Sequence, residues 1–444
     1  MGECLNGIQK VEGSNPFSSI LFFPVTTAMK KFTNLIISLF FLLISFSLTA
    51  NQESIDELKK AVEEIGKLKF KANIPVKYFS KQELKKYVEE LFEKEYPDEL
   101  AEKEELLIRL MGFTPDKKIE LKKERRKLFI DNAGGLYNEN TGELFALEDY
   151  RDTNYMNSMI LLHELRHGIQ DQYFDLSKLL EACSPSDFDD RRLALLAAVE
   201  GDATNVMFQF SDFKPEALMT GYNADVLLSF SPKGNNARIS NAPDIVKFQL
   251  IMPYVEGLKF FDSILKRKKW KGVNKVLQSP PVSSEQVLHP EKYLKNELPM
   301  RVLIAYKPKD YTLSHSGVIG EYYLNILLLS RHIYKDYAAG WGGDRFEIYK
   351  NTAGASYFFI WESLWDKDLF CANFYHVFKR FLEKTYKMNF RDGNTKGKAF
   401  IAGKSSSGTK PDYFFIYKFR NRIFFVRSND RNQINTFIDG GNYD

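Results

Sequence analysis

The sequence predicts an α+β fold, and three observations lead to that prediction. Behind Ser80, which opens a capping sequence with a glutamate three residues later, apolar residues recur at the spacing of an amphipathic helix. The apolar segments 128–131 and 143–147 flank a turn-rich stretch, which is typical of a β-hairpin. A second hairpin is expected near the C-terminus, over 413–427.

Length and composition indicate a large globular protein. With 444 residues, 44% of them apolar, the chain can bury a sizeable core and is too long for one small domain. The 62 basic and 58 acidic residues give a formal net charge of +4, and the positive charges are spread along the chain. Composition therefore gives no reason to expect nucleic acid as a partner.

The three cysteines are too few for a disulfide framework. They are Cys4, Cys183 and Cys371, and no CxxC pair occurs, which argues against a zinc site built from thiolates. A single Cys183–Cys371 disulfide stays open for an oxidising compartment.

The N-terminal region has the layout of a secretory signal peptide over 29–50. A basic start at Met29 precedes an apolar run over 35–46 and small residues up to Ala50. The run is short for a membrane span, so contact with a membrane is expected only if the segment stays uncleaved. Because the signal begins at an internal methionine, we interpret 1–28 as an upstream extension. We expect a periplasmic, cell-envelope or secreted protein.

Residues 51–127 are expected to form an N-terminal α/β segment. A charged helix up to about residue 69 is followed by a strand at 73–79, the helix behind Ser80 and a helix over 97–111. This segment is either a propeptide or an integral part of the fold, and the sequence leaves both readings open.

The following region, 128–242, is expected to form the core of the fold. The hairpin at 128–147 leads directly into a helix over 153–172, and a long helix follows over 186–210. The second half of the chain, 243–390, is predicted to be mainly helical.

The final residues, 391–444, are read as a linker and a hairpin tail. Gly, Ser, Lys and Thr predominate over 393–410, which favours a flexible linker before the C-terminal β-hairpin.

The helix at 153–172 contains the sequence His163-Glu164-Leu165-Arg166-His167. Positions i and i+4 lie one turn apart on the same helix face, so both imidazoles can bind one metal ion. Glu164 lies about 100° around the helix and can reach a metal-bound water without occupying the metal. Zinc lowers the pKa of such a water to near 7, and a carboxylate can take its proton.

A tetrahedral catalytic zinc site needs a third protein ligand. No histidine occurs between His167 and His289, and Glu200 is the best candidate because it lies in an apolar stripe of the helix over 186–210. A carboxylate there is costly unless a metal or a cation compensates it. The alternative is a buried pair between Glu200 and an arginine such as Arg166. The prediction is one Zn²⁺ per chain.

Zinc-binding histidines usually donate their second ring N–H to a carboxylate or carbonyl. Asp202 and Asp171 are the candidates for this supporting role, and Gln170 and Gln172 are further ones. Exposure on the surface is the alternative for each of them.

The segment 163–172, followed by Glu200-Gly201-Asp202-Ala203, resembles the gluzincin type of zinc metallopeptidase, in which two histidines of HExxH and a downstream glutamate bind zinc. It is also similar to a group of uncharacterised bacterial proteins with an HExxHxxQDQ helix, and further matches to that group extend over about 130–370. The sequence departs from the thermolysin-like pattern at Thr204, where that pattern has an aspartate four residues after the glutamate.

This resemblance implies a zincin-like domain in which a small twisted sheet covers the HExxH helix. An edge strand from 128–147 would pair with an extended peptide substrate. The resemblance also implies a tyrosine or histidine that donates to the developing oxyanion. His289 is the first choice, and Tyr254 and Tyr293 are weaker ones.

The expected function is therefore an exported zinc metallopeptidase that acts on a peptide or protein, with Glu164 as general base. One alternative is an inactive gluzincin-like protein with a binding or envelope role, against which the intact Glu164 argues. Another is a zinc amidase for cell-wall crosslinks, although no recognisable sugar-binding module accompanies the motif. A membrane-anchored structural protein with an accidental motif is the third.

Overall fold

The computed structural model describes residues 54–440 except 115–118, 133, 152–154, 184–187, 212–242, 330–335, 353–355, 396–397 and 406–410. The predicted signal peptide at 29–50 and the upstream extension at 1–28 therefore lie outside the described residues. Within the described part, no helix combines the length and the apolar character that crossing a membrane requires. Cys183 and Cys371 are both free thiols, so the disulfide considered above is not formed.

A three-stranded sheet forms in the order β1-β3-β2. β1 (Val76–Phe79) runs parallel to β3 (Glu143–Leu147), and β2 (Gly135–Asn138) pairs with β3 in antiparallel fashion. The predicted strand at 128–131 is wrong, because these residues belong to helix α5 (Leu121–Asn132). Lysine, arginine and glutamate fill that helix, and a short apolar run inside such a stretch does not distinguish a helix from a strand.

The helices predicted within 51–127 are confirmed as α2 (Ile55–Gly66), α3 (Lys81–Glu95) and α4 (Asp98–Met111). Ser54 and Ser80 each form a capping box with the glutamate three residues later, which satisfies backbone N–H groups at the helix start. Apolar residues of α2 share one buried cluster with those of the later HExxH helix. α2 therefore packs into the same core as the HExxH helix.

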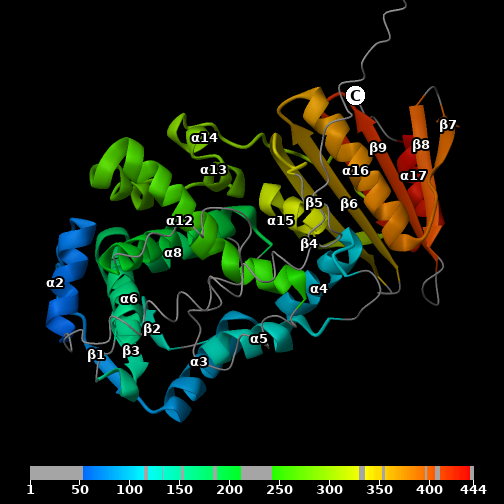
Figure 1. The fold of residues 1–444 in the computed structure, drawn as a ribbon. Coiled ribbons are helices and arrows are strands. Elements are labelled where there is room, and N and C mark those ends of the chain that lie inside the picture. The colour runs from blue at the N-terminus through cyan, green and yellow to red at the C-terminus, as the bar shows by residue number, and fades with distance from the viewer. Residues whose placement is uncertain are drawn as a thin grey trace, which may run out of the picture. The chain divides into compact units, whose positions relative to one another are not determined.

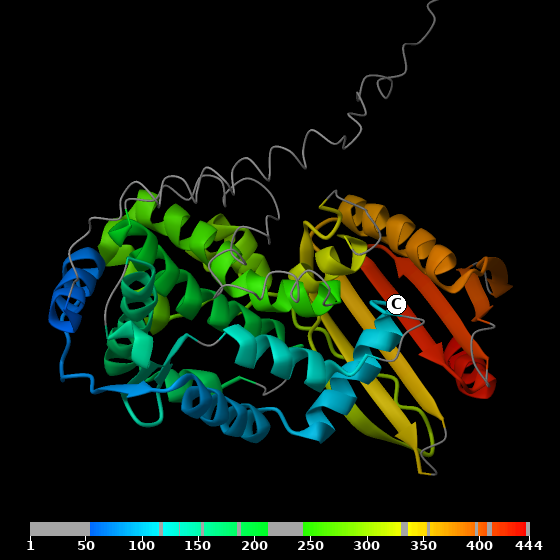
Figure 2. The same ribbon diagram turned by 60° about the horizontal axis from the view of Figure 1, so that its bottom comes forward.

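The centre of the fold is a stack of long helices (Figures 1 and 2). α6 (Tyr155–Phe174) packs against β2 and β3, and α8 (Asp190–Phe210) packs against both α6 and α12 (Asp244–Val273). α8 begins at Asp190, where the carboxylate of Asp189 caps its first N–H groups, and the predicted start at 186 lies outside the described residues.

Glycines at the crossing of α8 and α12 let the two backbones touch. A Cβ atom on Gly201 would lie 2.3 Å from the carbonyl carbon of Gly257, and one on Gly257 would lie 2.2 Å from the carbonyl oxygen of Ala197. Neither separation is sterically allowed, so only glycine fits at this crossing. The contact lies one residue after Glu200 and three residues after Tyr254.

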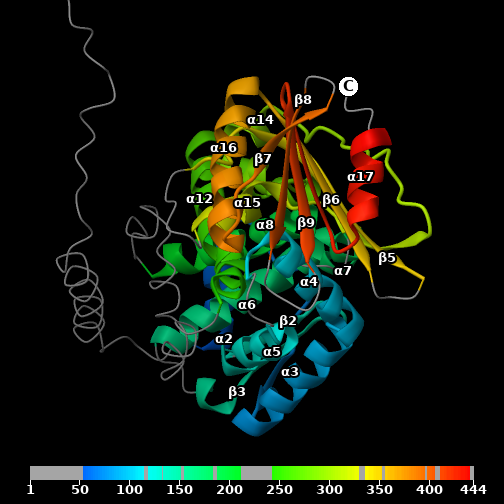
Figure 3. The ribbon, with the colours of Figure 1, turned by 90° about the vertical axis from the view of Figure 1, so that its right-hand side faces the viewer.

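The second half of the chain is built on a seven-stranded sheet whose neighbouring strands are all antiparallel. Its strands, in spatial order, are β4 (Tyr311–Gly317), β5 (Trp341–Asn351), β6 (Tyr357–Trp365), β10 (Arg422–Ser428), β9 (Asp412–Phe419), β8 (Lys398–Ser405) and β7 (Arg391–Thr395). Helix α16 (Asp368–Tyr386) covers one face and α17 (Arg431–Gly440) the other (Figure 3).

Short helices join these layers. They are η1 (Glu148–Tyr150), α7 (Leu176–Glu181), η2 (Val276–Gln278), α13 (Ser284–Leu288), α14 (Pro290–Leu294) and α15 (Gly320–Leu329).

Two sequence predictions for this half need correction, although the hairpin at 413–427 is confirmed as β9 and β10. The region 243–390 is not mainly helical throughout, because it contains β4, β5 and β6. β5 and β6 are buried on both faces, so they lack the alternating pattern that reveals a strand. The expected linker at 393–410 contains strand β8 and most of β7, since pairing with neighbouring strands overrides a composition typical of loops.

The crossing of α8 and α12 predicts the effect of Gly257→Ala. Alanine favours a helix over glycine by about 1 kcal/mol, but here its Cβ meets backbone that cannot rotate away. We expect a loss of at least about 2 kcal/mol in unfolding free energy, measured by denaturant titration. Gly440→Ala, where nothing lies within 4 Å of the added atom, is the control and should be neutral or slightly stabilising. Equal stability of both variants would contradict the close approach.

Candidate metal centre

The three predicted metal ligands come together between α6 and α8. The Nε2 atom of His163 lies 3.1 Å from Oε2 of Glu200 and 3.0 Å from Nε2 of His167. His167 Nε2 lies 3.4 Å from the same carboxylate oxygen. The two histidines are only 9% and 8% exposed, so the group faces the interior of the helix stack.

This triangle of atoms suits a tetrahedral zinc ion. At zinc–ligand distances of about 2.0–2.2 Å, neighbouring ligand atoms stand about 3.3–3.6 Å apart. The observed separations of 3.0, 3.1 and 3.4 Å need to widen by only a few tenths of an ångström. Two imidazoles and one carboxylate also form a donor set that zinc accepts, with a fourth position left for water or substrate.

His167 and Glu200 shift each other's pKa. Burial disfavours the charged form of His167, but the nearby Glu200 carboxylate outweighs it and raises the pKa of His167 to about 9. Burial likewise opposes ionisation of Glu200, but the charge of His167 and hydrogen bonds from both imidazoles hold its pKa well below the usual range. The site is therefore electrostatically prepared to hold a cation.

Glu164 lies beside the ligands and is held by the small sheet. Its Oε2 accepts a hydrogen bond of 2.8 Å from the backbone N–H of Tyr137 on β2. A Cβ atom on Gly135 would lie 3.3 Å from Cγ of Glu164, so the strand passes tightly over this side chain. The contact with the Tyr137 backbone was not foreseen, because no pattern in the sequence marks a backbone donor.

Gln170 orients His167. Its Nε2 donates to the carbonyl oxygen of Val199 and to Oδ2 of Asp202, at 2.9 Å each, so its Oε1 must face the imidazole. His167 Nδ1 donates to that oxygen at 2.8 Å, which leaves the lone pair of Nε2 directed at the metal position.

Asp202 was predicted to accept a hydrogen bond from a ligand histidine, but it does not contact one directly. It reaches His167 only through Gln170, and its carboxylate binds Arg166 at 2.8 Å and 3.2 Å in a fully buried ion pair. Arg166 also donates to Asn274. Because Arg166 is paired with Asp202, the alternative in which it neutralises Glu200 does not apply.

The supporting role predicted for Asp171 is wrong. Its Oδ2 accepts from the hydroxyl of Tyr137 and its Oδ1 from the backbone of Leu176, and no contact with a ligand histidine is formed. Gln172 is bonded to the backbone at Ala72. The hydroxyl of Thr204 is buried without a partner among the described residues.

Tyr254, and not His289, lies beside the three candidate ligands. Its ring stacks on His163 with 6.1 Å between centroids, and its hydroxyl lies near Glu200. Burial, together with the charges of Glu200 and Glu164, raises the pKa of Tyr254 well above its usual value, so it stays a donor. His289 contacts Glu321 instead.

Tyr293, the weaker alternative, lines a separate cavity of about 430 Å³ and donates to the carbonyl of Ser279.

Gln170→Ala tests the orientation of His167. Loss of the amide leaves Nδ1 without an acceptor and lets the ring rotate, so zinc affinity should fall about 10- to 100-fold. A competition titration with a chromophoric chelator measures this. Gln172→Ala, which removes an amide bonded only to backbone, is the matched control and should bind zinc as the wild type does. Unchanged affinity in Gln170→Ala would remove Gln170 from the centre.

Comparison with known proteins identifies one related region. Residues 307–427 match the model of a family described as a domain of unknown function (DUF8575). The match covers the larger sheet from β4 to β10 and includes none of the three candidate metal ligands. No curated protein and no solved structure matches the chain.

Proposed function

We propose that this chain is a zinc-dependent metallopeptidase with His163, His167 and Glu200 as ligands. The observation that supports it best is the triangle of their three ligand atoms, 3.0–3.4 Å apart, with Glu164 beside it. The signal sequence over 29–50 further leads us to propose that the enzyme acts outside the cytoplasm.

Glu164 is the general base in this proposal. Bound zinc would polarise the scissile carbonyl and acidify a water molecule. The carboxylate of Glu164 takes the proton of that water and later passes it to the leaving amine. The hydrogen bond from the Tyr137 N–H fixes one carboxylate oxygen, so the other is the one free to move the proton.

Tyr254 supplies the second function that peptide hydrolysis needs. Its hydroxyl already lies against Glu200, next to the position where the carbonyl oxygen would become negative. A neutral phenol donates a hydrogen bond to that oxygen and stabilises it more in the transition state than in the substrate.

The edge of the small sheet favours a peptide as substrate. Among the described strands β2 pairs with β3 alone, and Tyr137 donates its N–H to Glu164 and not to β3. The unpaired side of β2 therefore faces the metal centre. An extended peptide that adds to this edge by backbone hydrogen bonds would pass Glu164 and the histidines. Such pairing accepts many sequences, which fits a peptidase better than an amidase for one crosslink.

Glu164→Gln is the first test of the proposal. The amide keeps the size of the side chain and cannot accept a proton, so cleavage of a peptide library should fall at least about 100-fold while one zinc ion remains bound at this centre. Cleavage is followed by mass spectrometry, and zinc by elemental analysis.

Glu181→Gln, a change on an exposed residue of α7, is the control for handling and charge. Cleavage by Glu164→Gln at the wild-type rate would remove the base from the mechanism. A wild-type chain that holds no zinc would sink the whole proposal.

Tyr254→Phe separates transition-state stabilisation from binding. We expect kcat to fall about 10²- to 10³-fold with KM little changed, because the hydroxyl acts on charge that develops during the reaction. Tyr293→Phe removes a hydroxyl outside the metal centre and should leave both constants unchanged. A raised KM at constant kcat in Tyr254→Phe would assign the tyrosine to substrate binding instead.

A further inference from the structure

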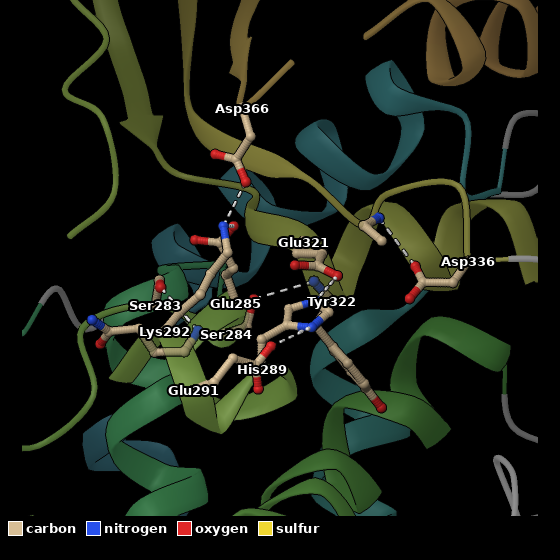
Figure 4. Close-up of polar contacts among 12 residues, drawn as sticks. Ser283, Ser284, Glu285, His289, Glu291, Lys292, Glu321, Tyr322, Asp336 and Asp366 are labelled. Carbon is tan, nitrogen blue, oxygen red and sulfur yellow. Dashed lines mark hydrogen bonds and ion pairs between the residues drawn. The ribbon is translucent and has the colours of Figure 1, made fainter. Parts of the chain in front are cut away.

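A second cluster of ligand-type side chains lies where α13, α15 and the segment before β5 meet (Figure 4). His289 ends α13, Glu321 lies in the first turn of α15, and Asp336 precedes β5. One ligand atom from each of the three lies within 4.8 Å of the others. The closest pair is His289 Nε2 and Glu321 Oε1, at 2.8 Å.

Glu321 is incompletely satisfied by this arrangement. The side chain is 0% exposed, and its second oxygen, Oε2, has no hydrogen-bond partner among the described residues. A buried carboxylate oxygen without a partner costs free energy that the pair with His289 does not recover. An ion that the carboxylate binds through both oxygens would give Oε2 a partner.

Ion pairing in the neighbourhood leaves the same three residues without a lysine or arginine partner among the described residues. Lys292 lies 2.6–2.8 Å from the carboxylates of Glu285, Glu297 and Asp366 and neutralises that group. Figure 4 shows the amine of this lysine in contact with Asp366. In the part of the chain that the structure describes, no lysine or arginine pairs with Glu321 or Asp336.

We propose that His289, Glu321 and Asp336 form a second metal site, distinct from the His163–His167–Glu200 centre, which binds a divalent ion such as Zn²⁺ or Mn²⁺. One imidazole and two carboxylates are donors that both ions accept. Asp336 is exposed, so the site opens to solvent on that side and leaves a position for water.

The ion would tie the two halves of the chain together. Glu321 and Asp336 belong to the region that matches the domain of unknown function, whereas His289 lies in the segment outside it that follows α12. An ion held by all three would fix the position of α15 against α13, which in turn contacts α8, the helix of Glu200.

The test counts the ions that the full chain binds. Metal-free protein is titrated with Zn²⁺, and separately with Mn²⁺, against a chromophoric chelator. His163→Ala, which lacks the first centre, should still bind one ion. His163→Ala combined with Asp336→Asn should bind none, or bind at least about tenfold more weakly. Asp336 is exposed, so its substitution does not endanger folding, which circular dichroism checks.

Glu291→Gln is the matched control, because it removes one negative charge on the other side of the same imidazole, 3.9 Å from Nδ1. In the His163→Ala background it should keep the ion, and the ion should raise Tm there but not in the Asp336→Asn double variant. Absence of any ion from His163→Ala, with either metal, overturns the site. Equal weakening by Glu291→Gln and Asp336→Asn overturns its ligands. Both results are independent of whether the first centre binds zinc.

Discussion

The backbone of α8 is held against two other helices at once, and the geometry of the metal centre depends on that constraint. On one side, Gly201 meets Gly257 of α12 so closely that no side chain fits between them. On the other side, Arg166 and Gln170 of α6 bind Asp202 and the backbone of Val199. A shift of α8 by one residue along its axis, about 1.5 Å, or its rotation by about 100°, would break both sets of contacts and carry Glu200 away from the histidines.

The polar network between α6 and α8 fixes the alignment of the two helices more than it stabilises the fold. Desolvating Arg166 and Asp202 offsets much of their mutual attraction, and such a pair often contributes little net stability compared with apolar residues of similar size. Removing one partner alone is expensive, about 3–5 kcal/mol, because the other charge stays buried. If α6 and α8 packed in another alignment, Arg166 or Asp202 would be buried without its partner at the same cost in free energy. The network thus selects the one alignment in which Glu200 completes the triangle of ligand atoms.

Local chemistry explains which features were predictable from the sequence. The capping box at Ser80 and the i, i+4 spacing of His163 and His167 depend on neighbouring residues only, and the structure has them as expected. Glu200 was also identifiable, because a carboxylate in an apolar stripe needs a compensating group nearby.

Choices that depend on tertiary contacts could not be made from the sequence. The sequence prediction preferred Asp171 to Gln170, and only the docking of α8 decides that Gln170 faces His167. Only the packing of α12 decides that Tyr254, and not His289, lies beside the ligand histidines. β5 and β6 were hidden because helices cover both faces of their sheet, which removes the alternating pattern.

The region that matches a domain of unknown function influences the position of the candidate metal centre, because it contacts the start of α8. Asp190 is fully buried at the start of α8 and accepts a hydrogen bond from the backbone N–H of Ser284. Its carboxylate lies against Gly320, where a positive φ of 78° and the missing Cβ make room for it. Ser284 in turn accepts from the N–H of Tyr322 on α15. Glu200 follows Asp190 by ten residues, about 15 Å along the same rigid helix. The matched region therefore contributes no ligand to the centre, yet it fixes one end of the helix that does.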